Sequence, residues 1–125
     1  MPSRIQRQRT KGWRLADHSD NAVIVSRPTK WGNPYRAIRG TVYGPARPVE
    51  GGELVAFSTF APARDAVAAA VEYYRRDIDC GIRSWLTTAM IRDALAGKDL
   101  VCWCPLDQPC HGDVLLQIAA EAAHA

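Results

Sequence analysis

The sequence predicts an α/β domain with a short, mostly parallel sheet, and two observations support this prediction. Apolar runs at residues 22–26 and 100–104 are typical of buried strands. Between them apolar residues recur at helical spacing, so the two strands are expected to run parallel and to be joined by helical crossovers. The chain has 125 residues, of which 47% are hydrophobic, and this predicts a single domain, 1–125, with its own core.

The first part of the chain is basic and rich in turn residues. Residues 1–14 hold five basic side chains and no acid, and they are expected to form a flexible arm or an edge strand. Two prolines and a glycine exclude a helix from residues 27–34. Residues 36–52 are rich in glycine and proline, which predicts a long loop with a hairpin around Gly44.

The second part of the chain predicts three helices. Pro62 suits the first turn of a helix that Gly81 ends, and its apolar face is formed by Val67, Val71, Tyr74 and Ile78. Residues 82–95 predict a second helix, which Gly97 ends. The last helix is expected from about residue 112 to 123.

The net charge of +3 hides an asymmetry along the chain. Residues 1–48 carry ten Lys or Arg against two acids, whereas residues 49–125 carry six against eleven. A positive front on a mildly acidic body favours a phosphate-bearing partner, because the field is concentrated rather than spread. A solvated basic surface is the structural alternative.

The lengths of the apolar segments also indicate where in the cell the protein is expected. No run approaches the length of a transmembrane helix, and the first residues lack the apolar stretch of a signal peptide. We therefore expect a cytoplasmic protein without a membrane partner. In a reducing cytoplasm the four cysteines are core thiols, metal ligands or reactive groups rather than disulfides.

The segment between the last strand and the last helix suggests a zinc site. Zinc is held by four tetrahedral thiolate or imidazole ligands, and Cys104, Cys110 and His111 supply three. Cys102 is harder to recruit, because residues i and i+2 of a strand lie about 6.5 Å apart. Only a kink at Trp103 or Cys104 would bring both sulfurs to one ion. Inert buried thiols are the structural alternative.

The same segment also supports a catalytic interpretation. Cys110 precedes a helix, where unpaired amides and the helix dipole lower a thiol pKa. His111 follows directly, and Asp113 falls in the first turn, where a carboxylate is also favoured for structural reasons. A thiolate nucleophile formed by these three residues is the corresponding hypothesis.

A third interpretation is a site for a phosphorylated ligand. The turn at His111 and Gly112 offers backbone amides that could cradle a phosphate. The other proposed ligand-binding residues come from the loop after the first buried strand: Arg27 and Lys30 for the phosphate, Trp31 for stacking on a base, and Asn33 for a base edge or sugar. In the structural alternative Trp31 caps the core and Arg27 forms a surface ion pair.

The position of these two loops predicts a common site. Residues 27–34 and 104–113 each follow a buried strand, and parallel strands place their carboxyl ends at one edge of a sheet. We therefore expect the two loops to share one pocket.

Several motifs resemble those of a known family. The residues involved are Gly12-Trp-Arg14, Lys30-Trp-Gly-Asn-Pro34 and the Cys102-Trp-Cys…Cys-His-Gly-Asp-Val-Leu115 segment. They resemble an uncharacterised domain family of actinobacteriophages and bacteria, and the resemblance implies a phage or prophage setting and, for a phage protein, the host cytoplasm. The strand–loop–helix ending also resembles Rossmann-like proteins that bind nucleotide-derived ligands, which implies a three-layer arrangement.

Three functional hypotheses follow. The first is an intracellular accessory protein that binds a nucleotide-like phosphorylated ligand at the carboxyl edge of the sheet, with turnover left open. The second is a non-enzymatic, zinc-stabilised nucleic-acid-binding protein that uses the basic arm. The third is a phage protein that binds a host protein.

Overall fold

The computed structural model describes residues 2–46 and 53–121. Its strands are β1 (Arg4–Gln6), β2 (Val23–Ile24), β3 (Arg36–Ile38), β4 (Thr41–Pro45), β5 (Leu54–Thr59) and β6 (Leu100–Cys102). Its helices are α1 (Asp65–Asp79), α2 (Thr88–Leu95) and α3 (His111–Ala120), with a single 3-10 turn η1 (Leu15–Asp17). Within the described ranges, no helix has the length and apolar character needed to cross a bilayer.

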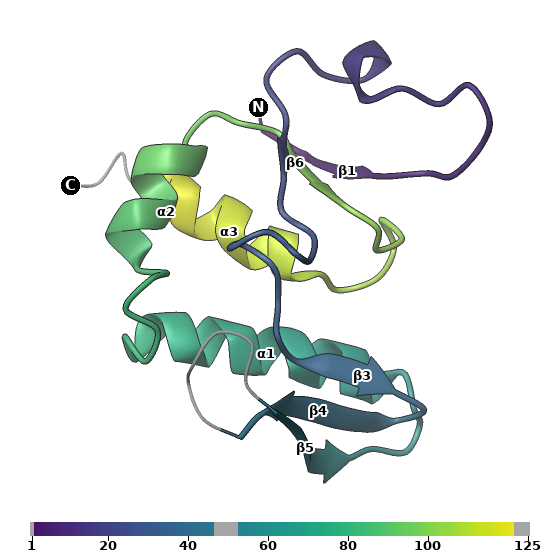
Figure 1. Ribbon diagram of the computed structural model, residues 1–125, viewed down its shortest axis with the longest axis vertical. Helices are drawn as coiled ribbons and strands as arrows, with labels where there is room; N and C mark the ends of the chain where they lie inside the picture. Colours follow the sequence, from purple (N-terminus) through teal and green to yellow (C-terminus); the bar gives the residue numbers. More distant parts are fainter. Residues whose placement is uncertain (1, 47–52, 122–125) are drawn as a thin grey trace.

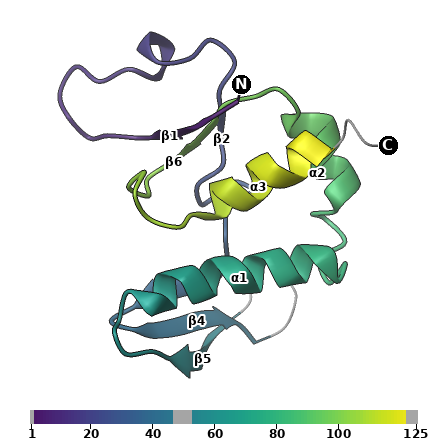
Figure 2. The same ribbon diagram turned by 180° about the vertical axis from the view of Figure 1, so that it is seen from behind.

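The predicted parallel sheet is present and has three strands in the order β1-β6-β2. β6 lies in the centre, with Ile5 and Ile24 both in register with Val101 (Figure 2). All three residues of β6 are buried, because α3 packs against β6 and β1. The α/β class and the parallel strands are therefore confirmed, while a Rossmann-like relationship stays a prediction.

A second, antiparallel sheet in the order β3-β4-β5 was not predicted. The prediction of a long loop over residues 36–52 is wrong where β3 and β4 form. Their two-residue turn is Arg39–Gly40, and both residues have positive φ, at 50° and 84°, as type I′ hairpin turns require. Gly44 is not in a turn. It lies in β4, where a Cβ would collide with the ring of Tyr35, so the glycine allows close packing.

The three helices form, but their bounds and one buried face differ from the prediction. α1 begins at Asp65, after Pro62, and buries Tyr74 and Ile78 as predicted. Ala66 and Ala70 complete its buried face, whereas Val67 and Val71, which were predicted there, are only partly buried. The predicted helix over 82–95 is wrong for residues 82–87, because α2 begins only after Thr87, whose hydroxyl caps the amide of Met90. α3 ends at Ala120, and the predicted helical residues 122–123 lie outside the described ranges.

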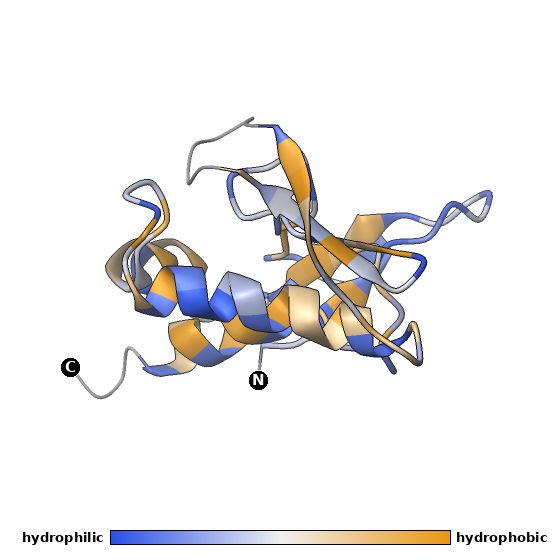
Figure 3. Ribbon diagram, turned by 90° about the horizontal axis from the view of Figure 1, so that it is seen from below, coloured by the Kyte–Doolittle hydropathy of each residue, from blue (hydrophilic) through white to orange (hydrophobic). Residues whose placement is uncertain are grey.

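The helices lie between the two sheets (Figure 1). α1 packs on β3 and β4 with one side and contacts α3 with another, and α3 in turn covers the parallel sheet. Figure 3 shows hydrophobic and hydrophilic stretches alternating along the helices, as this two-sided packing requires. The main core gathers around Leu100, Leu115, Tyr74 and Ile91, and a smaller one surrounds Tyr35 and Val42 under α1. The carboxyl end of the parallel sheet therefore faces the layer formed by α1 and β3.

Candidate functional site

Three potential metal ligands converge where β6 ends and α3 begins. Cys102 is the last residue of β6, Cys110 is the N-cap of α3, and His111 is its first residue. One ligand atom from each of these buried side chains lies within 4.8 Å of the others. The fold thus brings together two residues that the sequence predicted as ligands and one, Cys102, that it had set aside.

A bend in the chain brings a fourth sulfur to the cluster. β6 ends at Cys102, and residues 103 and 104 form a bend instead of continuing the strand. The Sγ atoms of Cys102 and Cys104 are therefore only 3.6 Å apart. The expectation that Cys102 is hard to recruit is corrected for this reason. Cys102, Cys104, Cys110 and His111 lie close together and could bind a metal ion.

His111 is held in the form that a metal needs. Its Nε2 lies 2.7 Å from the carbonyl oxygen of Val25, and because a carbonyl only accepts, Nε2 carries the proton. The unprotonated Nδ1 then points to the cluster, 3.7 Å from the Sγ of Cys110. Burial lowers the pKa of His111, which keeps the imidazole neutral. A carbonyl that fixes the far nitrogen is the usual second partner of a metal-bound histidine.

The three thiols share their protons unequally. Hydrogen bonding from Cys104 and Cys110 lowers the pKa of Cys102, so its sulfur is the most readily ionised of the three. Contact with Cys102 raises the pKa of Cys104 and of Cys110. Negative charge therefore gathers on Cys102 at the centre of the cluster, where a cation would relieve it.

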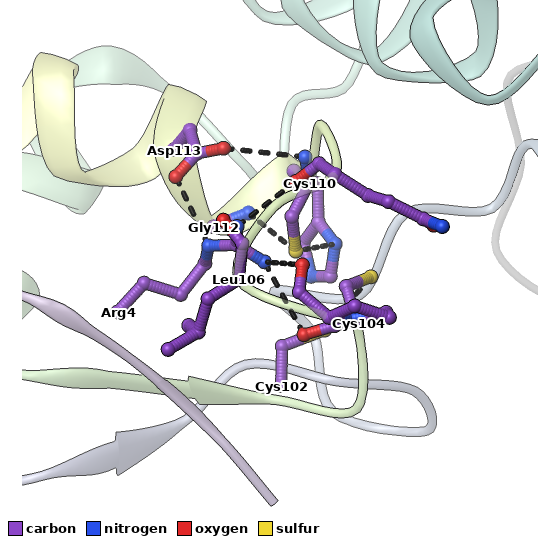
Figure 4. Close-up of polar contacts among 10 residues, drawn as sticks. Arg4, Cys102, Cys104, Leu106, Cys110, Gly112 and Asp113 are labelled. Atoms are coloured by element: carbon purple, nitrogen blue, oxygen red, sulfur yellow. Dashed lines mark hydrogen bonds and ion pairs between the residues drawn. The ribbon is translucent and has the colours of Figure 1, made fainter.

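Arg4 holds the loop between β6 and α3 in place, and sequence reasoning missed it. Its guanidinium donates to four carbonyl oxygens of this loop, at 2.9–3.4 Å. Its Nε lies 3.1 Å from the carboxylate of Asp113, and the side chain is only 7% exposed. Figure 4 shows Arg4 between Asp113 and the loop, on the side of the cluster that faces β1. A single side chain thus satisfies the backbone of a loop with no regular structure of its own.

The first turn of α3 is closed by its own side chains. The Sγ of Cys110 accepts from the amide of Gly112 at 3.4 Å, and the carboxylate of Asp113 accepts from the amide of Cys110 at 3.3 Å. The amide of Asp113 donates to the carbonyl of Cys110 at 3.0 Å. The amides of Gly112 and Asp113 therefore already have acceptors. Asp113 acts as a helix cap and as the ion-pair partner of Arg4.

The two predicted loops meet at one cleft of about 540 Å³. Arg27 and Asn33 from the first loop line it together with Cys110 and His111 from the second, which confirms that the loops share a pocket. The cleft is also lined by the cluster itself, that is by Cys102, Cys104, Cys110 and His111. Among the described residues that line the cleft, none carries a carboxylate. The cleft therefore joins the cluster to the layer of α1 and β3.

One wall of the cleft combines cations with an unpartnered hydroxyl. Arg27 and Arg36 both line it, and burial, followed by the charge of Arg36, lowers the pKa of Arg27. Arg27 also donates to the carbonyl oxygens of Asn33 and Tyr35, at 2.6 and 3.4 Å. Ser26 is buried, and its hydroxyl has no hydrogen-bond partner in the part of the chain that the structure describes. An anion in the cleft would relieve the repulsion between the two arginines.

The other residues predicted to bind the ligand, Lys30, Trp31 and Asn33, have structural contacts instead. Asn33 donates to the carbonyl of Ala70 and accepts from the amide of Tyr35, at 3.1 and 2.9 Å. Trp31 is 6% exposed within the core, as the structural alternative expected. Lys30 is exposed, with its Nζ 4.7 Å from the centroid of the Trp31 ring, and neither residue lines the cleft.

Comparison with known proteins places most of the chain in one family. A family model described as a domain of unknown function, DUF4326, matches residues 5–121. No curated protein and no solved structure matches the chain. The matched range includes β6, all residues that line the cleft and the four Cys and His residues of the cluster. These features therefore lie inside the family domain, and Arg4 directly precedes it.

Proposed function

The chain belongs to the DUF4326 family, and we propose that it is a zinc-stabilised domain whose cleft binds a nucleotide-like phosphorylated ligand. The observation that carries the proposal is the single cleft lined by two arginines, a buried hydroxyl and the Cys and His cluster. Two parts of the proposal, the metal and the ligand, are supported by separate contacts.

The donor set favours zinc. Three thiolates and one neutral imidazole are a usual set for a structural zinc ion, with Zn–S near 2.3 Å and Zn–N near 2.0 Å. A tetrahedron of these bonds separates two sulfurs by about 3.8 Å and a sulfur from a nitrogen by about 3.5 Å. The observed separations of 3.6 Å for Cys102 to Cys104 and 3.7 Å for Cys110 to His111 agree with both. With all four donors bound the ion has no open position, so its role is structural.

The charges around the cleft favour a phosphate position away from the proposed metal. A zinc ion with three thiolates and an imidazole carries a net charge of −1, which repels an anion. Arg4 lies beside the cluster but is committed to Asp113 and the loop carbonyls. Arg27 and Arg36 carry the positive charge that lines the cleft itself. The phosphate is therefore expected at these two arginines, with the Ser26 hydroxyl as a further donor.

Apolar residues of the lining fit the rest of such a ligand. They come from α1 and from β3 beyond Arg36, and they are Ala37, Ile38, Val67, Ala70 and Val71. A mixed site, with a few polar groups that fix orientation and an apolar surface for a flat ring, is typical of cofactor and nucleotide pockets. The volume of about 540 Å³ lies in the range of such pockets.

Native mass spectrometry of freshly purified protein, followed by calorimetric titration, tests both parts. We expect one zinc per chain and binding of nucleoside monophosphates or diphosphates, with no binding of the matching nucleosides. Arg27→Ala and Arg36→Ala should each weaken binding by roughly 1.5–3 kcal/mol, the usual value of a hydrogen bond to a charged group. Arg14→Ala is the control, because Arg14 is exposed and paired with Asp17. Equal affinity of the Arg27 and Arg36 variants and the parent would reject the ligand site, and a metal-free, stable protein would reject the zinc.

A further inference from the structure

We propose that the surface formed by Trp103 and residues 6–10, at the rim of the cleft, binds single-stranded nucleic acid. Trp103 lies between two members of the metal cluster, yet its side chain is 37% exposed. The guanidinium carbons of Arg7 and Arg9 lie 4.4 and 4.5 Å from the centroid of its ring. An exposed indole beside two cations has the two elements that proteins use to bind single strands, a stacking platform and a positive track for phosphates.

The parallel sheet places these residues together. β1 pairs with β6 in register, and the amide of Arg7 extends the ladder by donating to the carbonyl of Cys102 at 2.7 Å. Side chains two residues apart in an extended chain point to the same side, so Arg7 and Arg9 both reach Trp103. Trp103 follows Cys102 at the bend that gathers the cysteines, and it borders both the cleft and the depression formed with residues 6–10. Folding of the metal loop thus fixes the stacking platform.

The surface is hollowed and has one sign of charge. A depression of about 510 Å³ is lined by Trp103 and by residues 6–10, which contribute two arginines, two glutamines and a threonine. Among the described residues no carboxylate lies within ion-pair distance of Arg7 or Arg9, whereas Arg4 and Arg14 are paired with aspartates. The depression therefore offers free cations to a backbone and amide groups to base edges.

The chemistry favours a single strand over other anionic partners. Stacking on Trp103 needs an unpaired base, because the faces of paired bases are covered by their neighbours in a duplex. The existing contacts of Arg7 and Arg9 with the ring do not oppose this, since an exposed cation–π contact is weaker than base–indole stacking. An arginine displaced from the ring can stack on the base or bind a phosphate.

Fluorescence anisotropy with a labelled oligo-dT of about ten nucleotides, within the usual site size of such surfaces, tests the proposal. We expect the double variant Arg7→Gln/Arg9→Gln to reduce affinity at least tenfold and to flatten the slope of log K against log salt by about one unit or more. Trp103→Leu should weaken binding about tenfold without changing that slope, because it removes stacking and no charge. Trp103→Phe should keep most of the affinity that Trp103→Leu loses, because phenylalanine can still stack on a base.

Arg14→Gln is the matched control and should leave both quantities unchanged, since Arg14 is basic, close in sequence and outside the depression. Metal content and the circular dichroism spectrum confirm that each variant is folded. Failure of the parent protein to bind the oligonucleotide, equal binding by the double variant, or preference for a duplex of the same length would overturn the proposal. Arg27 lines the cleft alone, and Arg7 and Arg9 line the depression alone, so Arg27→Ala should bind the oligonucleotide normally and the arginine variants distinguish this proposal from the one for the cleft.

Discussion

The parallel sheet, which carries the Cys and His cluster, has less regular structure than the antiparallel sheet, which contributes only β3 to the cleft. The strands β1, β2 and β6 span at most three residues each, whereas β4 and β5 span five and six. The antiparallel sheet is covered by α1, and its Tyr35 ring stacks on Tyr73 at 5.1 Å. A tight hairpin and a helix that packs on it therefore fix this half through contacts less distant in sequence than those of the parallel sheet.

The parallel sheet is held instead by a few polar contacts between residues far apart in the chain. Arg4 binds carbonyls about a hundred positions away, and Asp99 accepts from the amide of Ser3 and the hydroxyl of Ser19. The Cys and His cluster closes the loop between β6 and α3. Backbone polar groups that lack a ladder must be satisfied in some other way, and here the Arg4 guanidinium and the Sγ of Cys110 do so. The comparison shows that the stability of the parallel half depends on a few particular side chains, whereas that of the antiparallel half depends on packing.

Metal removal is expected to have the largest effect and to act on the parallel half. Strong chelation should lower the melting temperature by roughly 15 °C or more, because the metal binding energy of a structural zinc site is folding energy and each kcal/mol shifts Tm by several degrees. His111→Ala should behave like chelated parent protein. Cys80→Ser is the control, since Cys80 is exposed and outside the cluster. An unchanged melting temperature in the presence of chelator would show that the half does not depend on the metal.

Replacement of Arg4 by Met should have the next largest effect. The four loop carbonyls and Asp113 would lose their donor, which predicts a loss of about 2–4 kcal/mol in the free energy of unfolding. Arg14→Met removes an equally basic side chain from an exposed pair and should cost less than about 1 kcal/mol. Urea denaturation of the two variants measures the difference. Similar losses would mean that Arg4 contributes no more than a surface charge.

The same comparison explains which parts could be predicted from the sequence. Cys104, Cys110 and His111 were predicted as ligands because residues with metal chemistry are close in the sequence itself. The meeting of the two loops followed from parallel strands, whose ends lie at one edge. Both predictions needed only local residue types and one rule of topology.

The rest depends on contacts that local patterns do not contain. Arg4 is one of five similar basic residues in 1–14, and only the register of β1 with β6 distinguishes it. Cys102 joined the cluster because of a bend, which a run of apolar residues does not indicate. β5 was missed because its residues are mostly exposed and show no alternation. The helix over 82–95 was predicted too long because Arg83 is drawn out of helical pattern into a buried ion pair with Asp77.

Gly44→Ala should produce a smaller loss, confined to the antiparallel half. The added methyl would meet the ring of Tyr35, and overpacking of this kind costs about 1–3 kcal/mol. Since Gly44 lies in β4 and is not among the residues that line the cleft, zinc content measured by elemental analysis should stay at the parent level. Loss of zinc in this variant would show that the two halves are coupled and would break the comparison.

The smallest expected effect concerns Asp99 and the pH dependence of the parallel half. Hydrogen bonds from the Ser19 hydroxyl and the Ser3 amide lower the pKa of this carboxylate below its usual value, so the folded state favours the charged form. The unfolded chain then binds the proton more readily, and the stability gained is present above the unfolded pKa of about 3.9 and is lost as pH falls through the lower folded pKa. Because the carboxylate is exposed and screened by solvent, the effect should be small. Urea denaturation of the parent and of Asp99→Asn between pH 3 and pH 6 should show curves that differ most above about pH 4 and converge below it. A constant difference across this range would mean that the aspartate stabilises the junction of β1, β2 and β6 by shape and hydrogen bonding alone, with no contribution from its charge.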